Sequence, residues 1–122
     1  MDMKLELVPI PVTDVDRAKA FYTDQLGFAA DVDVTPWPGV RVVQLTPPGS
    51  ACSIVVGVGM SDPDAPRVSN LHLVVDGIDE TRAELLGRGV EVGEVQDVGG
   101  GVRYAGFTDP DGNSWALQEI SR

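Results

Sequence analysis

The sequence contains only one cysteine, Cys52, among its 122 residues. A single cysteine excludes an intramolecular disulfide and every metal or redox motif that needs paired cysteines. We therefore expect a protein of a reducing, cytoplasmic environment.

Basic residues are also scarce, with nine Lys and Arg against 19 Asp and Glu and a net charge of -10. No Lys/Arg cluster offsets this charge, which argues against nucleic acid and anionic membranes as partners. The most apolar stretch, Ile54 to Met60, is interrupted by Gly57 and Gly59. It is far shorter than the roughly 20 residues that cross a bilayer. The N-terminal residues Met1 to Glu6 lack the basic and then apolar pattern of a signal peptide.

A mass of 12.9 kDa and a hydrophobic content of 43% fit one globular domain. Residues 12–20 align with residues 75–83 at an offset of 63, and the same offset places residues 49–54 on 112–117. The repeat predicts one domain, residues 1–122, made of two tandem modules at 1–60 and 70–122 with a proline-rich linker at 61–69.

Both modules carry the same predicted order of elements: a strand, a helix and three strands. Thr13 is the expected N-cap of the first helix, which should run to about Leu26. The other segments follow from apolar alternation, helical spacing and turn residues. Strands are expected at 5–10, 29–34, 40–46, 52–58, 70–75, 90–95, 102–108 and 114–120, with the second helix at 78–86. The predicted fold class is therefore α+β.

Three segments, Val12–Tyr22, Leu26–Phe28 and Phe107–Glu119, resemble the vicinal oxygen chelate superfamily, which includes glyoxalase I, extradiol dioxygenases and the bleomycin and fosfomycin resistance proteins. This resemblance implies two βαβββ modules whose eight strands form a curved mixed sheet around a groove. It also implies that a small molecule binds on the concave face and that two chains form a homodimer.

Enzymes of this superfamily usually hold a divalent metal with His or Glu on the first and last strand of each module. The resemblance places Leu7, Ser53, Asn70 and Ala116 at these four positions. None of them is the imidazole or carboxylate that such metals prefer. We therefore expect neither a metal nor another cofactor.

His72 follows Asn70 by two residues and Gln118 follows Ala116 by two, so each pair shares one face of its strand. Asn70, His72, Gln118 and Ser53 are thus candidates for a polar cluster on the groove floor. His72 is the candidate catalytic base or ligand anchor. The alternative is a histidine that is only solvated or structurally satisfied.

Trp37 lies in a Pro-Trp-Pro-Gly segment and is either a rigid wall for a planar ligand or a plug for the loop. Gln44 is a further candidate ligand contact on a strand that borders the groove, where Arg41, Arg103 and Tyr104 are also placed. An inward arginine would select an anionic ligand. Trp115 has the opposite strand parity to Ala116 and is expected in the core.

The groove is expected to be apolar, with Leu7, Pro9, Val55, Val74 and Ala116 as its lining. Such a site suits an aromatic or polycyclic ligand. The leading hypothesis is metal-independent binding or sequestering of a small organic molecule. The alternative is a lyase, isomerase or dioxygenase that uses His72 or an unconventional metal site.

Overall fold

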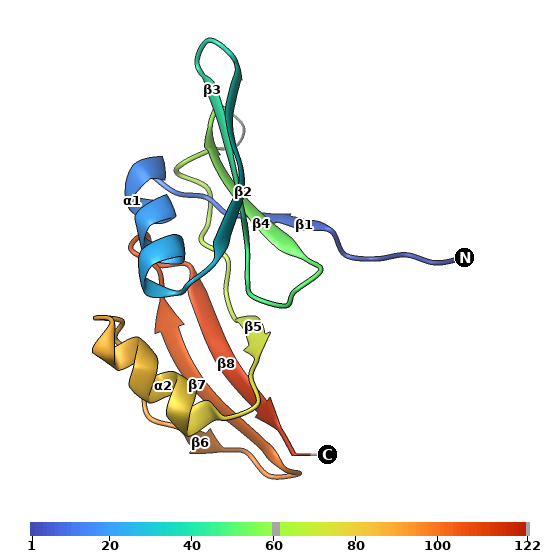
Figure 1. Ribbon diagram of the computed structural model, residues 1–122, viewed down its shortest axis with the longest axis vertical. Coiled ribbons are helices and arrows are strands. Elements are labelled where there is room, and N and C mark those ends of the chain that lie inside the picture. Colours follow the sequence, from blue (N-terminus) through green and yellow to red (C-terminus); the bar gives the residue numbers. More distant parts are fainter. Residues whose placement is uncertain (60–61, 122) are drawn as a thin grey trace. The chain divides into compact units, whose positions relative to one another are not determined.

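A computed structural model describes residues 1–59 and 62–121 (Figure 1). The chain divides into two compact units, residues 1–67 and 68–122. The predicted boundary between module and linker at residues 60 and 61 lies outside the described residues. No described helix has both the length and the apolar character that a membrane span requires.

Each unit has the order strand, helix, three strands, which confirms the α+β class and the βαβββ repeat. The elements of the first unit are β1 (Leu7–Pro9), α1 (Val15–Ala20), the π-helical turn η1 (Phe21–Gln25), β2 (Ala29–Trp37), β3 (Val40–Thr46) and β4 (Ser53–Val58). Those of the second unit are β5 (Leu71–Val74), α2 (Ile78–Gly87), β6 (Gln96–Asp97), β7 (Val102–Thr108) and β8 (Ser114–Ile120).

The eight strands form two four-stranded mixed sheets, ordered β1-β4-β3-β2 and β5-β8-β7-β6. In each sheet the first strand is parallel to the last strand of its unit, and the other neighbours are antiparallel. Leu7 pairs with Ser53 in the first sheet, and His72 pairs with Ala116 in the second.

The core of each unit lies between its helix and one face of its sheet. Alternate residues of β3 and β4, such as Val43, Leu45 and Val56, are fully buried in the first unit, as is Tyr22 of η1. In the second unit the buried set is Ile78 and Leu85 of α2 with Ala105, Phe107, Trp115 and Leu117 of the sheet. The rings of Phe107 and Trp115 stack with centroids 6.2 Å apart. The prediction that Trp115 belongs to the core is confirmed.

The predicted strand at 90–95 is wrong, because these residues form a loop and the short strand β6 begins at Gln96. Val90 and Val92 are buried. The alternation of apolar and polar residues over 90–95 therefore reflects burial of the valines and does not indicate a hydrogen-bonded strand. The Arg82 guanidinium donates to the Val92 and Gly93 carbonyls, at 3.4 and 2.7 Å, and so occupies acceptors that a ladder would use.

Other boundaries also differ from the expectation: the strand predicted at 5–10 is only Leu7–Pro9, and the helix predicted to run to about Leu26 ends at Ala20 and continues as η1 to Gln25. The N-cap of α1 is Asp14, whose carboxylate accepts from the Arg17 amide at 3.1 Å, while the Thr13 hydroxyl accepts from the Arg17 guanidinium. The strand predicted at 29–34 extends to Trp37, because β2 is an edge strand and Pro36 costs it no ladder partner.

Candidate functional site

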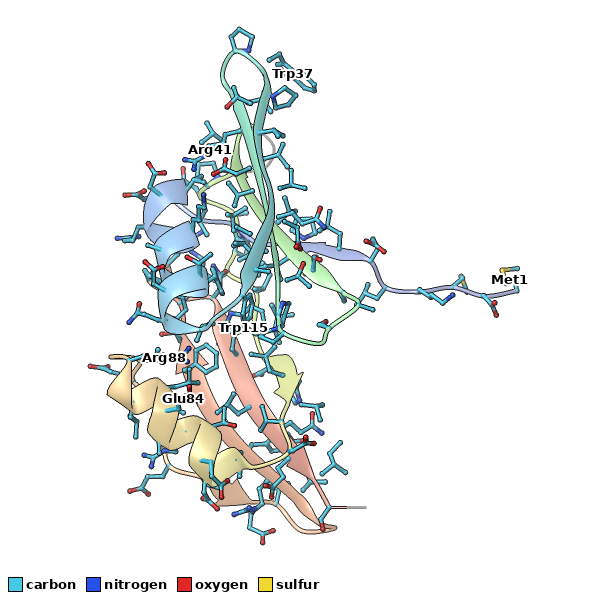
Figure 2. The ribbon with its side chains drawn as sticks, viewed as in Figure 1. Met1, Trp37, Arg41, Glu84, Arg88 and Trp115 are labelled. Carbon is cyan, nitrogen blue, oxygen red and sulfur yellow. The ribbon has the colours of Figure 1, made fainter. Side chains whose placement is uncertain are left out.

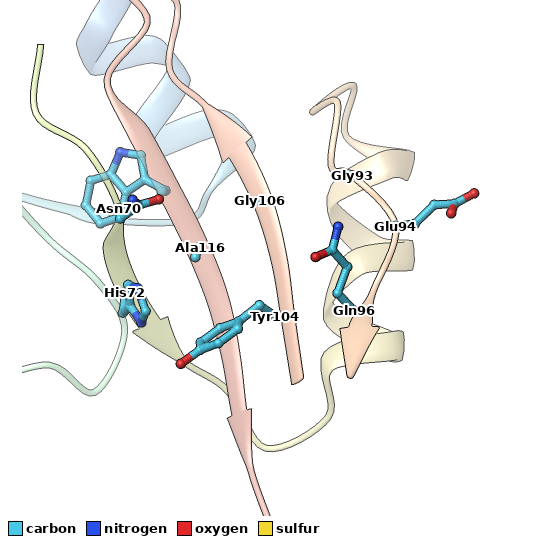
Figure 3. A pocket seen from close by; sticks show the side chains of 9 residues that line it. Asn70, His72, Gly93, Glu94, Gln96, Tyr104, Gly106 and Ala116 are labelled. Atoms are coloured by element: carbon cyan, nitrogen blue, oxygen red, sulfur yellow. The ribbon is translucent and has the colours of Figure 1, made fainter. Parts of the chain in front are cut away.

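A cavity of about 540 Å³ lies in the second unit (Figure 3). Its residues come from strands β5, β6, β7 and β8 and from the loops before β5 and β6. They are Asn70, His72, Gly93, Glu94, Gln96, Tyr104, Gly106, Trp115 and Ala116. Tyr104 and Gly106 alternate along β7 with the buried Ala105 and Phe107, so most of the lining belongs to the sheet face that α2 leaves open.

The floor of the cavity is made of small residues. Gly106 and Ala116 are direct neighbours in the β7–β8 ladder, and His72 pairs with Ala116 from the other side. A β-carbon added at Gly106 would lie 3.6 Å from the Trp115 carbonyl oxygen, which is ordinary contact. Neighbouring atoms would therefore tolerate a side chain at Gly106, and the absence of one leaves open volume above the sheet.

His72 is held in place by two partners across the sheet. Its Nδ1 lies 2.7 Å from Oε1 of Gln118, and its ring meets the Tyr104 ring edge to face with centroids 5.2 Å apart. Figure 3 shows the His72 and Tyr104 side chains on one side of the strands, with Ala116 between them. The sequence-based expectation that His72 and Gln118 lie together is confirmed, and Asn70 lines the same cavity.

Ser53 and Gln44 lie in the first unit. The Ser53 hydroxyl is 2.6 Å from the Thr46 hydroxyl and accepts from the Gln44 amide at 3.4 Å. Thr46 in turn donates to the Asp31 carboxylate. These residues form a polar chain of their own. Whether they contact a ligand stays a prediction.

Trp37 is the last residue of β2, and its side chain is 62% exposed (Figure 2). It therefore does not plug the loop, which removes one of the two interpretations. It is not among the residues that line the cavity of the second unit. Its role as a ligand wall stays a prediction.

The two arginines placed near the groove are held by carboxylates. Arg41 bonds to Asp33 and to Asp16 of α1, at 2.9 and 2.6 Å. Hydrogen bonds from Arg41 and Lys19 hold the pKa of Asp33 well below its usual range. The arginine is thus neutralised within its own unit.

Arg103 makes the corresponding contacts in the second unit, to Glu119 at 2.6 Å and to Asp79 of α2 at 3.1 Å. Glu119 also accepts from the Ile78 amide at 3.0 Å, at the start of α2. This amide first, and Arg103 second, lower the pKa of Glu119. Selection of an anion by Arg41 or Arg103 therefore has little support.

The residues present do not fit the metal that the resemblance implies. By ladder register the counterpart of Leu7 is His72 and not Asn70, because His72 faces Ala116 as Leu7 faces Ser53. Even so, one imidazole opposite an alanine is not a chelating set. Across residues 1–59 and 62–121 no group of three or more His, Cys, Asp and Glu side chains could hold a metal ion.

The cavity is more polar than the expected groove. Of the five predicted apolar lining residues only Ala116 lines it: Leu7, Pro9 and Val55 belong to the first unit, and Val74 is 65% exposed. Sequence reasoning missed Gly93 and Glu94, because the apolar alternation over residues 90–95 predicts a strand there and not a loop. It also gave no signal for Gln96 or Gly106. Gly93 inside that apolar alternation was the available sign of an irregular segment.

Two βαβββ units with an open sheet face are typical of a class of small α+β proteins. Comparison with known proteins identifies the family. Residues 4–117 match the model of the Glyoxalase/Bleomycin resistance protein/Dioxygenase superfamily, and the chain belongs to this family. No curated protein matches the chain.

Several solved structures are similar over nearly the full length. TnmS3, an antibiotic binding protein from Streptomyces sp. CB03234, is 34% identical, with 98% of each chain covered and a TM-score of 0.85. A glyoxalase/bleomycin resistance protein from the same strain is also 34% identical, with 93% of this chain and 98% of that chain covered and a TM-score of 0.77. A superfamily member from Sphaerobacter thermophilus DSM 20745 is 29% identical, with 97% and 98% covered and a TM-score of 0.84.

Proposed function

We propose that this protein binds a small organic molecule, without a metal, in the cavity of the second unit. The observation that carries the proposal is the cavity itself: about 540 Å³ above a floor of Gly106 and Ala116, with His72 and Tyr104 beside it. This volume falls within the range of about 300–1,000 Å³ that suits drug-sized ligands. The similarity to a protein described as antibiotic binding supports the same function.

The lining favours a planar, uncharged or weakly polar ligand. A flat ring can lie on the floor that Gly106 and Ala116 leave open, and the Asn70, Gln96 and Tyr104 side chains can bond to its polar edge. An aromatic or polycyclic compound has this shape. We retain Trp37, Gln44 and Ser53 of the first unit as further proposed contacts.

We also propose that the protein is a homodimer. The side chains of Met1, Met3 and Leu5 are all exposed and alternate with charged residues along the extended segment before β1. Figure 1 shows this segment leaving the edge of its sheet. Such an apolar row next to an edge strand favours pairing with a second chain. Sedimentation over a range of concentrations tests this, and a persistent monomer would contradict it.

The binding proposal is tested by screening a library of aromatic compounds for a rise in Tm, because a ligand that binds the folded state stabilises it. His72→Ala should weaken the best ligand by about 1–3 kcal/mol, since its partner loses a hydrogen bond. Val74→Ala is the matched control: it lies on the same strand, but its side chain does not line the cavity. Equal losses in both variants would contradict the cavity assignment.

A second candidate is catalysis with His72 as general base, favoured by its 2.7 Å bond to Gln118, which fixes the imidazole beside the cavity. Incubating each ligand with the protein and measuring its mass distinguishes the two. Conversion that His72→Ala abolishes supports an enzyme. Unchanged ligand after long incubation supports a binding protein.

A further inference from the structure

The hydrogen bond between His72 and Gln118 determines which nitrogen of the imidazole carries the hydrogen. The atom of Gln118 in contact, at 2.7 Å, is Oε1, the amide oxygen. An amide oxygen only accepts, so Nδ1 of His72 is the donor. A neutral imidazole has one N–H, and therefore Nε2 holds a lone pair.

That lone pair is available to a ligand. Within residues 1–59 and 62–121 the structure gives the His72 imidazole no hydrogen bond besides the one to Gln118. Tyr104 packs edge to face on the ring and restrains its orientation, and His72 lines the cavity while Gln118 does not. Gln118 does not line the cavity itself but bonds to His72, which does.

We propose that Gln118 is a positioning residue that makes His72 a hydrogen-bond acceptor, so that the cavity selects planar ligands carrying an O–H or N–H donor, such as phenols. This inference rests on the proposed function. A ligand that lacks the donor leaves the Nε2 lone pair unpaired beside an apolar ring, which costs affinity. We expect a donor to improve affinity by about tenfold or more.

The tautomer is measured without any ligand. His72 is the sole histidine, so a long-range ¹H–¹⁵N spectrum contains the ring nitrogens of one residue only. In alkaline buffer, where imidazole is neutral, the wild type should show the hydrogen on Nδ1. A hydrogen on Nε2 in the wild type would overturn the inference, because Gln118 would then present its NH₂ group.

Two variants separate positioning from packing. Gln118→Met keeps the length of the side chain but offers no amide acceptor, and should shift the hydrogen toward Nε2, its preferred site in free histidine. Gln118→Glu keeps an acceptor at the same reach and should restore the Nδ1–H form. If Gln118→Met retains the wild-type tautomer, Gln118 does not position His72.

The ligand class is tested with two probes, 2-naphthol and 2-methoxynaphthalene, which differ in one donor hydrogen and a methyl group. 2-Naphthol should bind about tenfold more tightly to the wild type and to Gln118→Glu, and this preference should disappear in Gln118→Met. Equal binding of both probes to the wild type overturns the selection while leaving the binding function intact. If neither these probes nor any library compound binds, the proposed function fails, whereas the tautomer measurement still decides the role of Gln118.

Discussion

The two units share one framework but carry different side chains on their open sheet faces. Leu7 and Ser53 face each other across β1 and β4, and His72 and Ala116 occupy the same ladder position across β5 and β8. The first unit thus has its polar group on the last strand, and the second has it on the first strand. The exchange leaves an imidazole above a small residue in the second unit only.

The units also differ at the next ladder position. Gln44 pairs with Val55 in the first unit, and Tyr104 pairs with Gln118 in the second. A histidine at the position of Leu7 would have no partner from Val55 to hold its Nδ1. The comparison teaches that the cavity depends on a few open-face residues and that the repeated framework alone does not create it.

The buried turn before the last strand provides the largest expected difference between the units. Asn113 is fully buried: it donates to the Asp109 carboxylate at 2.8 Å and accepts from the Val68 amide at 3.1 Å. Asn113→Ala removes the donor to Asp109 Oδ2 and leaves the Val68 amide without its side-chain acceptor, and should cost about 2–3 kcal/mol of unfolding free energy. The expected fall in Tm, measured by calorimetry, is roughly 8–12 °C.

Ser50 is the residue that the 63-residue offset places on Asn113. In the described part of the chain its exposed hydroxyl bonds to the Cys52 backbone alone, at 2.8 and 3.1 Å. Ser50→Ala should change stability by less than about 0.5 kcal/mol. Similar losses in the two variants would show that the turns contribute equally and would break the comparison.

The second prediction concerns a substitution that fills the cavity. Gly106→Val places a branched side chain on the floor, where strand conformation accepts it and the nearest atom to a new β-carbon is 3.6 Å away. Affinity for a library ligand, measured by calorimetry, should fall by about tenfold or more, equal to about 1.4 kcal/mol. The Tm without ligand should stay close to that of the wild type.

Gly87→Ala, at the end of α2 with open space around it, is the control for adding a side chain to the second unit. It should leave affinity unchanged. Full affinity in Gly106→Val would place the ligand outside this cavity.

The sequence predicted the framework well because periodicity and turn residues report burial and chain reversal directly. Strands β3, β7 and β8 begin and end at the predicted residues. The loop at 90–95 was not predicted, because its valines are buried at alternate positions, as the apolar residues of a strand are. Its backbone carbonyls instead accept from Arg82, a long-range contact that local pattern does not reveal.

The site was predicted in part. His72, Asn70 and Gln118 were found because strand parity places them on one face. The equivalence of Leu7 with Asn70 was wrong because the link between first strand and helix spans residues 10–14 in the first unit but only 75–77 in the second. The 63-residue offset, which aligns the two helices, therefore places Leu7 on Asn70, two residues before its true counterpart His72. Only the strand register shows this difference.

The third prediction concerns acid stability. Asp33 bonds to Arg41 and Lys19, so its pKa in the folded chain lies below the ordinary value of about 3.9 in the unfolded chain. A lowered folded pKa stabilises the protein above about pH 4, and this contribution is lost as the pH falls further. Asp33→Asn removes the contribution, so the difference in urea midpoint between wild type and variant should stay constant above about pH 4 and shrink steadily as the pH is lowered from about 4 to about 2. A gap that stays constant below about pH 4 would contradict the linkage.

Glu119→Gln is the second-unit counterpart of that experiment. The pKa of Glu119 is lowered by the Ile78 amide and by Arg103, so the sign of the effect is the same. We expect a smaller convergence than for Asp33→Asn, because Asp33 is bonded to two cations and Glu119 to one. A larger effect at Glu119 would reverse the order of the two units.

The smallest expected effect is optical and decides which unit the ligand meets. Trp37 of the first unit is exposed, whereas Trp115 lines the cavity of the second unit and is 3% exposed. A ligand in the cavity should quench Trp115, so Trp37→Phe should retain quenching with the blue-shifted emission of a buried indole. Quenching that is greater in the wild type than in this variant would support the predicted contact with Trp37. If Trp37→Phe abolishes all quenching, the ligand does not approach Trp115, and the first unit, with its exposed indole and its Ser53 and Gln44 side chains, becomes the binding unit.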